Sequence, residues 1–248
     1  MLVDHCNLSC DGCSALSPEL DKKFASIESF EKDIQELSKH CHYEWIELLG
    51  GEPTLHKHID EFIRIAKQYN IADRVHVTTN GVRLPKMTDY FYSNVSYLTV
   101  NYYPNTHINH AEIDQFVIEK QKQFGFIYDK RPTNTFNKMY RDVIMTNPMR
   151  LQYTYDNCII VQEWKCQIFR EGVYYKCGPP SVYHLKDPTY DKLVDGIEIH
   201  KDNFKDRLTN YLEGKKYLEA CKVCQGLLGP EIPHQQIKIY KKNRVINT

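Results

Sequence analysis

Several features that would define a function class at once are missing from this 248-residue chain. Lys plus Arg number 32 and Asp plus Glu number 32, so the formal net charge is zero. Such a chain has no overall electrostatic attraction to nucleic acid or to an anionic membrane, which argues against nucleic-acid binding. It has no apolar run of about 18 residues and no hydrophobic signal-peptide segment at its N-terminus. We therefore expect a cytoplasmic protein with no membrane partner.

Histidine metal motifs, internal repeats and low-complexity tracts are also missing. The 11 histidines form no H-E-x-x-H or similar pattern, which argues against a histidine-bound catalytic metal. Apolar residues make up 42% of the chain and charged residues 26%, as in an ordinary globular protein. This length suits one larger domain with a smaller appendage.

Cysteine, by contrast, is abundant. The chain has nine cysteines and no secretion signal, a combination that favours metal or redox chemistry over disulfide bonds. They fall into two groups, one within the first 41 residues and one after residue 157. Cys41 lies on the apolar side of an expected helix, so we interpret it as a core residue.

Cys6, Cys10 and Cys13 form a C-x3-C-x2-C pattern within eight residues. Three thiolates on one irregular loop can hold three irons of a four-iron, four-sulfur cluster and leave the fourth iron open to another ligand. A structural zinc site usually needs four protein ligands in paired C-x2-C spacing, which the first gap here does not match. Zinc, or cysteines without a metal role, remain the alternatives at this point.

Strand-like and helix-like segments alternate through the first half of the chain. Strands are expected at 1–4, 44–49, 74–79, 97–103 and 125–128. Helices are expected at 26–41, 57–69, 86–95 and 109–123. This alternation predicts βα units, a parallel sheet and an α/β fold.

Chemically distinctive segments come directly after these expected strands. The cysteine loop follows the first, Gly50-Gly51-Glu52-Pro53 the second, Asn80-Gly81 the third and Asn101-Tyr102 the fourth. In a parallel barrel the carboxyl ends of the strands meet at one mouth, where ligands bind. The four segments are therefore predicted to form one site.

The cysteine loop, Gly50-Gly51-Glu52-Pro53 and Thr79-Asn80-Gly81 occur in an order and spacing that resembles the radical S-adenosylmethionine (radical SAM) superfamily. The resemblance covers roughly residues 1–130. It implies a partial (β/α)6 TIM-like barrel, for which we expect a domain over residues 1–150.

The resemblance also implies an enzyme, an oxidoreductase or isomerase. Cys6, Cys10 and Cys13 would bind a [4Fe-4S] cluster, and S-adenosylmethionine would chelate its open iron. Reductive cleavage would give a 5′-deoxyadenosyl radical that abstracts hydrogen from a small-molecule substrate. The outcome would be oxidation, epimerisation or rearrangement at an unactivated C–H bond, with an electron donor such as flavodoxin or ferredoxin.

Further site residues follow only from the resemblance. The expected S-adenosylmethionine contacts are Gly50, Gly51, Glu52, Thr79, Asn80, Asn101 and Arg131 (or Lys130). Two departures are evident: Gly12 stands where the family often has an aromatic residue, and the chain has no clear G-x-I-x-G-x-x-E segment.

A second cysteine set occupies the last third of the chain. Glu171-Gly172 predicts a hairpin turn between Cys166 and Cys177, and Cys221 and Cys224 follow a helix-like stretch at about 203–220. Together these four cysteines could hold zinc or an auxiliary cluster, and spacing alone does not choose between them.

The same set is similar to the Twitch domain, which implies that residues 151–248 form a small hairpin and helix lobe carrying a second [4Fe-4S] cluster. Cys158 is interpreted as a spare core residue. Two further alternatives stay open. The same chemistry could act on a ribosomal peptide or a nucleic-acid base, or the cysteines could belong to a non-catalytic iron–sulfur or zinc module. The last alternative would leave Gly50-Gly51-Glu52-Pro53 unexplained.

Overall fold

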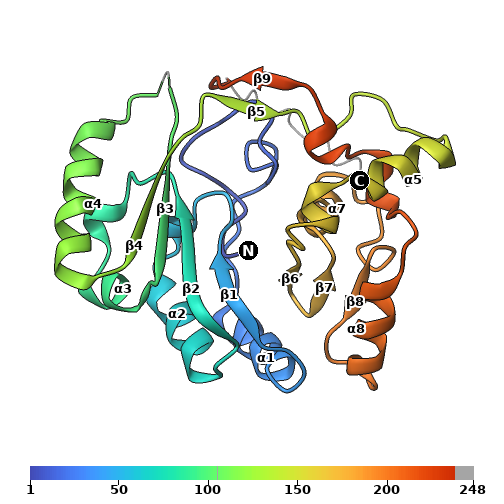
Figure 1. Ribbon diagram of the computed structural model, residues 1–248, viewed down its shortest axis with the longest axis horizontal. Coiled ribbons are helices and arrows are strands. Elements are labelled where there is room, and N and C mark those ends of the chain that lie inside the picture. The colour runs from blue at the N-terminus through green and yellow to red at the C-terminus, as the bar shows by residue number, and fades with distance from the viewer. Residues whose placement is uncertain (105, 238–248) are drawn as a thin grey trace, which may run out of the picture.

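A four-stranded parallel sheet forms the centre of the computed structural model, which describes residues 1–104 and 106–237 (Figure 1). Its order is β1-β2-β3-β4, and each neighbouring pair is parallel. The strand bounds are Tyr43–Leu48 (β1), Ala72–Thr79 (β2), Tyr97–Tyr102 (β3) and Ile127–Pro132 (β4). The prediction of an α/β fold with a parallel sheet is confirmed, and the sheet of the described part has four strands.

Helices connect these strands. Their bounds are Ile27–Leu37 (α1), Ile59–Gln68 (α2), Asp89–Asn94 (α3) and His110–Phe124 (α4), with short 3-10 turns at Pro53–Leu55 (η1) and Leu84–Lys86 (η2). The first helix begins where Ser26 accepts a hydrogen bond from the Ser29 backbone N–H, as an N-cap should. It ends earlier than the expected residue 41.

The two faces of the sheet differ in polarity. Val75, Val77, Leu98 and Val100 alternate with polar residues and are buried in one apolar core with the helices. Each such buried side chain contributes about 1.5–3 kcal/mol. The alternating polar residues lie on the opposite face, which α3 and α4 do not cover (Figure 1).

Residues 1–4 are extended but do not form a strand of the sheet. The Leu2 N–H donates to the Leu49 carbonyl at 2.7 Å, and the Gly51 N–H donates to the Val3 carbonyl at 2.7 Å. The N-terminal segment is thus held beside the end of β1, and it leads directly into the cysteine loop.

The C-terminal part begins with α5 (Pro148–Asp156) and α6 (Ile159–Gln162) and contains a three-stranded antiparallel sheet. Its other elements are β6 (Ile168–Arg170), β7 (Val173–Tyr175), α7 (Gly178–Lys186), β8 (Gly196–Glu198), α8 (Phe204–Glu213), η3 (Glu219–Lys222) and η4 (Gly226–Leu228). Glu171 and Gly172 have positive φ angles of 48° and 77°, which suit a hairpin turn. The predicted hairpin is therefore present, whereas the expected helix at 203–220 stops before Gly214.

Buried side chains and backbone pairing both join the C-terminal part to the rest. Arg170 donates two hydrogen bonds of 2.7 Å to the Asp4 carboxylate, and both side chains are buried. The strand β5 (Thr135–Asn137) pairs with β9 (Glu231–Pro233) above the cysteine loop (Figure 1). Within the described residues, no helix is long and apolar enough to cross a membrane.

Candidate functional site

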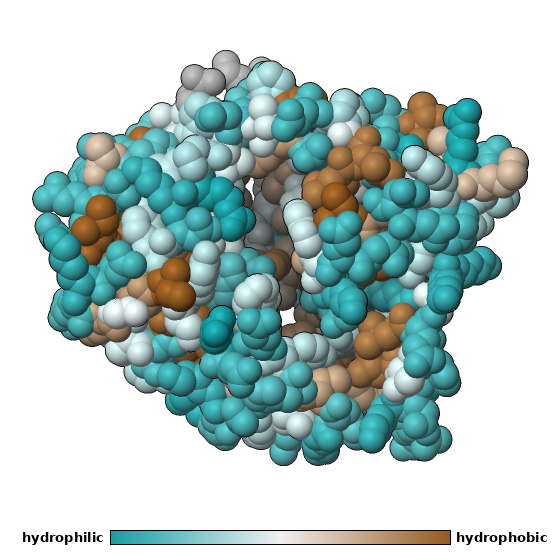
Figure 2. All heavy atoms as spheres, in the orientation of Figure 1, coloured by the Kyte–Doolittle hydropathy of each residue, from teal (hydrophilic) through white to brown (hydrophobic). Residues whose placement is uncertain are grey.

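A cavity of about 600 Å³, here called the central cavity, lies between the parallel sheet and the C-terminal part. Figure 2 shows the hollow between these two halves of the molecule. Its lining includes every residue expected from the first half of the sequence: Cys6, Cys10, Cys13, Gly50, Gly51, Glu52, Thr79, Asn80, Asn101 and Arg131. The predicted convergence of these segments is therefore observed.

The three loop cysteines are free thiols, with Cys10 the most buried. Burial raises the pKa of Cys6 to about 12 and that of Cys10 to about 11, so a bound metal would have to displace their protons. Among the described residues, no three His, Cys, Asp or Glu side chains converge as a single metal ion requires. Three cysteine thiols on one loop are donors of the kind that an iron–sulfur cluster takes.

Gly50 and Gly51 have no room for a side chain, because the N-terminal segment passes close to them. A Cβ on Gly50 would lie 2.4 Å from the Val3 carbonyl oxygen, and one on Gly51 would lie 2.2 Å from the His5 oxygen. The Glu52 N–H also donates to the His5 carbonyl at 3.1 Å. The glycines let the N-terminal segment cross this turn at close range on its way to Cys6.

Glu52 is buried, and its carboxylate links two of the predicted motifs. One oxygen accepts from the Thr54 N–H at 3.0 Å and from the Thr79 hydroxyl at 2.6 Å. The other accepts from the Asn80 N–H at 2.8 Å. Burial raises the pKa of Glu52, and these hydrogen bonds oppose that rise. The Glu52 side chain is thus occupied by the chain's own donors.

Asn80 connects the third motif to the cysteine loop. Its side-chain amide donates to Asn7 Oδ1 at 2.7 Å and lies 3.7 Å from Cys6 Sγ. Sequence reasoning assigned Asn80 to S-adenosylmethionine but did not foresee this contact. The contact depends on how two distant loops meet.

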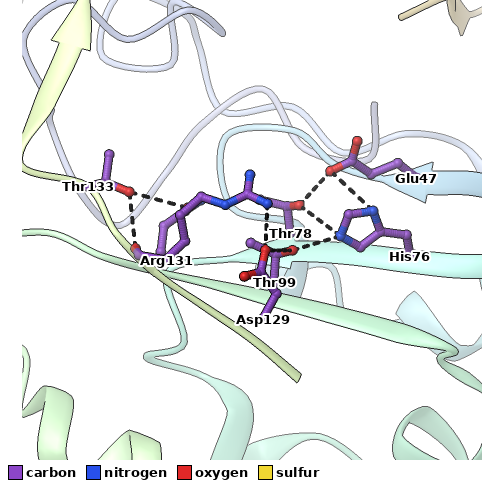
Figure 3. Close-up of polar contacts among 8 residues, drawn as sticks. Glu47, His76, Thr78, Thr99, Asp129, Arg131 and Thr133 are labelled. Carbon is purple, nitrogen blue, oxygen red and sulfur yellow. Dashed lines mark hydrogen bonds and ion pairs between the residues drawn. The ribbon is translucent and has the colours of Figure 1, made fainter. Parts of the chain in front are cut away.

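Polar side chains cover the sheet face that looks into the central cavity (Figure 3). We call this set the polar face: Glu47, His76, Thr78, Thr99, Asp129 and Arg131. The Thr78 hydroxyl donates to Glu47 at 2.5 Å, and His76 Nε2 lies 2.9 Å from the Thr99 hydroxyl. Glu47 pairs in register with His76, and Thr99 with Asp129, so alternation alone brings them to one side.

The two carboxylates of the polar face, Asp129 and Glu47, differ in how closely a cation pairs with them. Arg131 forms an ion pair of 2.5 Å with Asp129, so its guanidinium is already partly neutralised. Burial lowers the pKa of His76, which favours the neutral ring at pH 7. Among the described residues, the one ion-pair contact of Glu47 is with that ring, at 4.0 Å. Glu47 is therefore a carboxylate on the cavity wall with little positive charge beside it.

The second cysteine group differs in membership from the expected one. Cys158, Cys177, Cys221 and Cys224 line one small, mostly apolar pocket of the C-terminal part. Cys166, expected as a ligand, is exposed and lies on the wall of the central cavity instead. Cys158, interpreted as spare, takes the place beside the other three, because α5 and α6 fold it back toward η3 and η4. The hairpin spacing in the sequence had favoured Cys166, and the structure brings Cys158 to the group instead.

Hydrogen bonds to Asp195 fix the turn that carries Cys221. Asp195 is buried and accepts hydrogen bonds from the backbone N–H groups of Glu219 at 2.7 Å and Ala220 at 2.6 Å. Burial raises the pKa of Cys177, and the neighbouring thiols Cys224 and Cys221 raise it further. These thiols would thus be protonated in the metal-free protein.

Residues 2–102 match the family model described as the radical SAM superfamily. The resemblance drawn from the cysteine loop is thereby confirmed. For the Twitch-like region, residues 151–248, the resemblance remains a prediction.

Particular relatives match over shorter stretches. A GTP 3',8-cyclase of Chlorobaculum tepidum is 37% identical over 94 residues, which cover 36% of this chain and 26% of that protein. A GTP 3',8-cyclase of Actinobacillus pleuropneumoniae is 29% identical over 91 residues, with the same shares. The matched segment thus spans about a quarter of these relatives. A crystal structure of BtrN with AdoMet and 2-DOIA aligns at TM-score 0.48 and 15% identity, over 86% of this chain and 85% of that one.

Proposed function

We propose that this protein is a radical SAM enzyme that acts on a small polar molecule. One observation carries the proposal: the three cysteines of the loop, the Gly50-Gly51-Glu52 turn and Asn80 share the wall of one cavity. The match of residues 2–102 to the superfamily model supports it.

Cys6, Cys10 and Cys13 would hold a [4Fe-4S] cluster in this enzyme. The bound cluster and S-adenosylmethionine supply the one-electron chemistry that starts hydrogen abstraction. The chain holds the loop in place through Asn80 and positions the backbone of Gly50 and Gly51 for the methionine end. Asn101 would meet the ribose hydroxyls and Arg131 the carboxylate.

Aromatic side chains near Gly12 offer a place for adenine. Tyr103 and Phe136 line the cavity, and Phe136 Cβ would lie 3.8 Å from a Cβ on Gly12. Their rings are 5.7 Å apart, edge to face. They would supply the aromatic contact that the loop itself lacks.

The substrate would lie against the polar face. A cavity of about 600 Å³ falls within the usual range of small-molecule sites, roughly 300–1,000 Å³. The Glu47 carboxylate and the Thr78 hydroxyl, which line the cavity, favour a molecule rich in hydrogen-bond donors. An external reductant, such as flavodoxin or ferredoxin, would supply the electron.

Cys158, Cys177, Cys221 and Cys224 would bind an auxiliary [4Fe-4S] cluster. They lie together in one pocket, whereas Cys166 faces the central cavity. Four protein thiolates would occupy all four irons, which leaves no position for substrate. The cluster would serve electron transfer or hold the C-terminal part together.

Anaerobic reconstitution tests the main proposal. The protein, given S-adenosylmethionine and dithionite, should release 5′-deoxyadenosine, and Cys10→Ala should abolish this product. Cys41→Ala is a matched control, because Cys41 packs against the core away from the cavity. The proposal is wrong if the parent makes no 5′-deoxyadenosine or if Cys10→Ala makes as much as the parent.

Iron counting tests the auxiliary site. Cys158→Ala should lower the iron content by about half, since one of two four-iron clusters would be lost. Cys166→Ala should keep the full content. The opposite result would restore Cys166 as the ligand.

A further inference from the structure

The segment Glu231–Ile237, here called the C-terminal strap, lies along the cysteine loop. The Asp11 N–H donates to the Gln235 carbonyl at 3.0 Å, and the Ile237 N–H donates to the Ser9 carbonyl at 2.8 Å. These contacts join residues more than 220 positions apart. The strap thus covers one side of the cysteine loop.

Side chains of the strap also pack against the cysteine loop and the residues beside it. Ile232 reaches Gly12, where an added Cβ would lie 2.8 Å from Ile232 Cδ1. His234 is 2% exposed, and its ring stacks on Tyr103 at 4.8 Å between centroids. The strap therefore covers the cysteine loop at Gly12.

Gln236 directs a hydrogen-bond donor at one cysteine sulfur. Its Oε1 accepts from the Ser9 N–H at 2.7 Å, which fixes the orientation of the amide because only the oxygen can accept. Its Nε2 then faces Cys10 Sγ at 3.1 Å and donates to it.

His234 approaches the same sulfur, with Nε2 at 3.1 Å from Cys10 Sγ. Its Nδ1 lies 3.1 Å from the Pro104 carbonyl, an acceptor, so Nδ1 carries the hydrogen in the neutral ring. Nε2 then accepts from the thiol in the metal-free protein. His234 is thus a buried ring packed against Cys10, and Gln236, whose Nε2 also lies 3.3 Å from His234 Nε2, is the donor to the sulfur.

We propose that the C-terminal strap tunes the cluster site, with His234 as a positioning residue for Cys10 and Gln236 as the donor that favours the reduced cluster. This inference rests on the proposed function, since it takes Cys10 to be a cluster ligand. On reduction the cluster gains one electron from an external reductant, and no bond at Cys10 forms or breaks. A hydrogen bond to a ligand sulfur stabilises the added negative charge and raises the reduction potential.

Substitution of Gln236 in the reconstituted protein tests whether this residue raises the reduction potential of the cluster. Gln236→Met keeps the length of the side chain and removes the donor. At a fixed potential, the ratio of reduced to oxidised cluster should fall about three- to tenfold, which corresponds to about 30–60 mV for one electron. Electron paramagnetic resonance during a redox titration measures the ratio, and the signal that S-adenosylmethionine perturbs identifies the correct cluster.

Gln235→Met is the matched control. Gln235 lies on the same strap, but its side chain donates to Asp11. The reduction potential of the cluster in Gln235→Met should therefore equal that in the parent. An unchanged potential in Gln236→Met, or an equal shift in Gln235→Met, would overturn the role of Gln236.

Hydrogen exchange on the metal-free protein tests strap docking independently. The amides of Asp11 and Ile237 should be protected in the parent and lose protection in His234→Ala. Rapid exchange of both amides in the parent would overturn the inference. If the strap amides are protected but no S-adenosylmethionine-responsive cluster forms, the proposed function fails and the docked strap stands.

Discussion

Replacement of Glu52 by Gln should destabilise the protein although the two side chains have the same shape. The N–H groups of Thr54 and Asn80 are fixed donors, and each donates to a different carboxylate oxygen of Glu52. An amide has only one oxygen, so its NH2 group must face one of these donors however the amide is turned. The nearby threonine hydroxyls can rotate, but the two backbone groups cannot.

The size of the effect follows from burial. Glu52 is 1% exposed, so water cannot replace the lost partner. One buried N–H left without an acceptor costs about 1–3 kcal/mol, and the misdirected NH2 group adds to this, so we expect a total of about 2–4 kcal/mol. In a chain of this size each kcal/mol lowers Tm by about 2–4 °C.

Chemical denaturation of the metal-free parent and Glu52→Gln would measure the difference in the free energy of unfolding. Glu61→Gln is the control, because Glu61 is exposed and forms an ion pair with Arg64 on the surface of α2; it should change stability by less than about 1 kcal/mol. If Glu52→Gln were as stable as the parent, the assignment of two fixed donors to two carboxylate oxygens would be refuted.

Three further substitutions have defined outcomes. Gly51→Ala should destabilise by about 1–3 kcal/mol or more, measured by thermal melting, because the new Cβ meets the His5 backbone. Asp4→Ala should cost about 3–5 kcal/mol in denaturant unfolding, because it removes the two close contacts of the buried Arg170 guanidinium and leaves the longer one, 3.9 Å, to Glu171. Asp195→Asn should cost about 1–3 kcal/mol and lower iron retention, since one oxygen cannot serve two backbone donors.

Matched control variants show whether each loss of stability comes from the stated contact or from substitution in general. Gly178→Ala controls for Gly51→Ala, because a Cβ there meets only the side chain of Ile168 at 3.4 Å. Asp73→Asn controls for Asp4→Ala, because Asp73 is exposed and pairs with His42. If a control lost as much stability as its test variant, the stated contact would not explain the loss.

The sequence by itself determined the parallel sheet, the loop of three cysteines and the hairpin at Glu171-Gly172. The reason is that alternation, helical spacing and turn residues are local, and each is satisfied by neighbours a few positions away. Alternation even decided which side chains form the polar face, once the strands paired in register. The expected first strand at 1–4 was the exception, since too few residues carry the pattern.

Only the tertiary structure decided which cysteines meet and what covers them. The hairpin in the sequence favoured Cys166, whereas the folding of α5 toward η3 and of α6 toward η4 brings Cys158 to the other three cysteines. Glycines 50 and 51 suggested room for a ligand, whereas the close neighbour is the chain's own backbone at residues 3–5. Gln236 reaches Cys10 from the far end of the chain. Contacts of this range depend on how whole elements pack, and no local pattern records them.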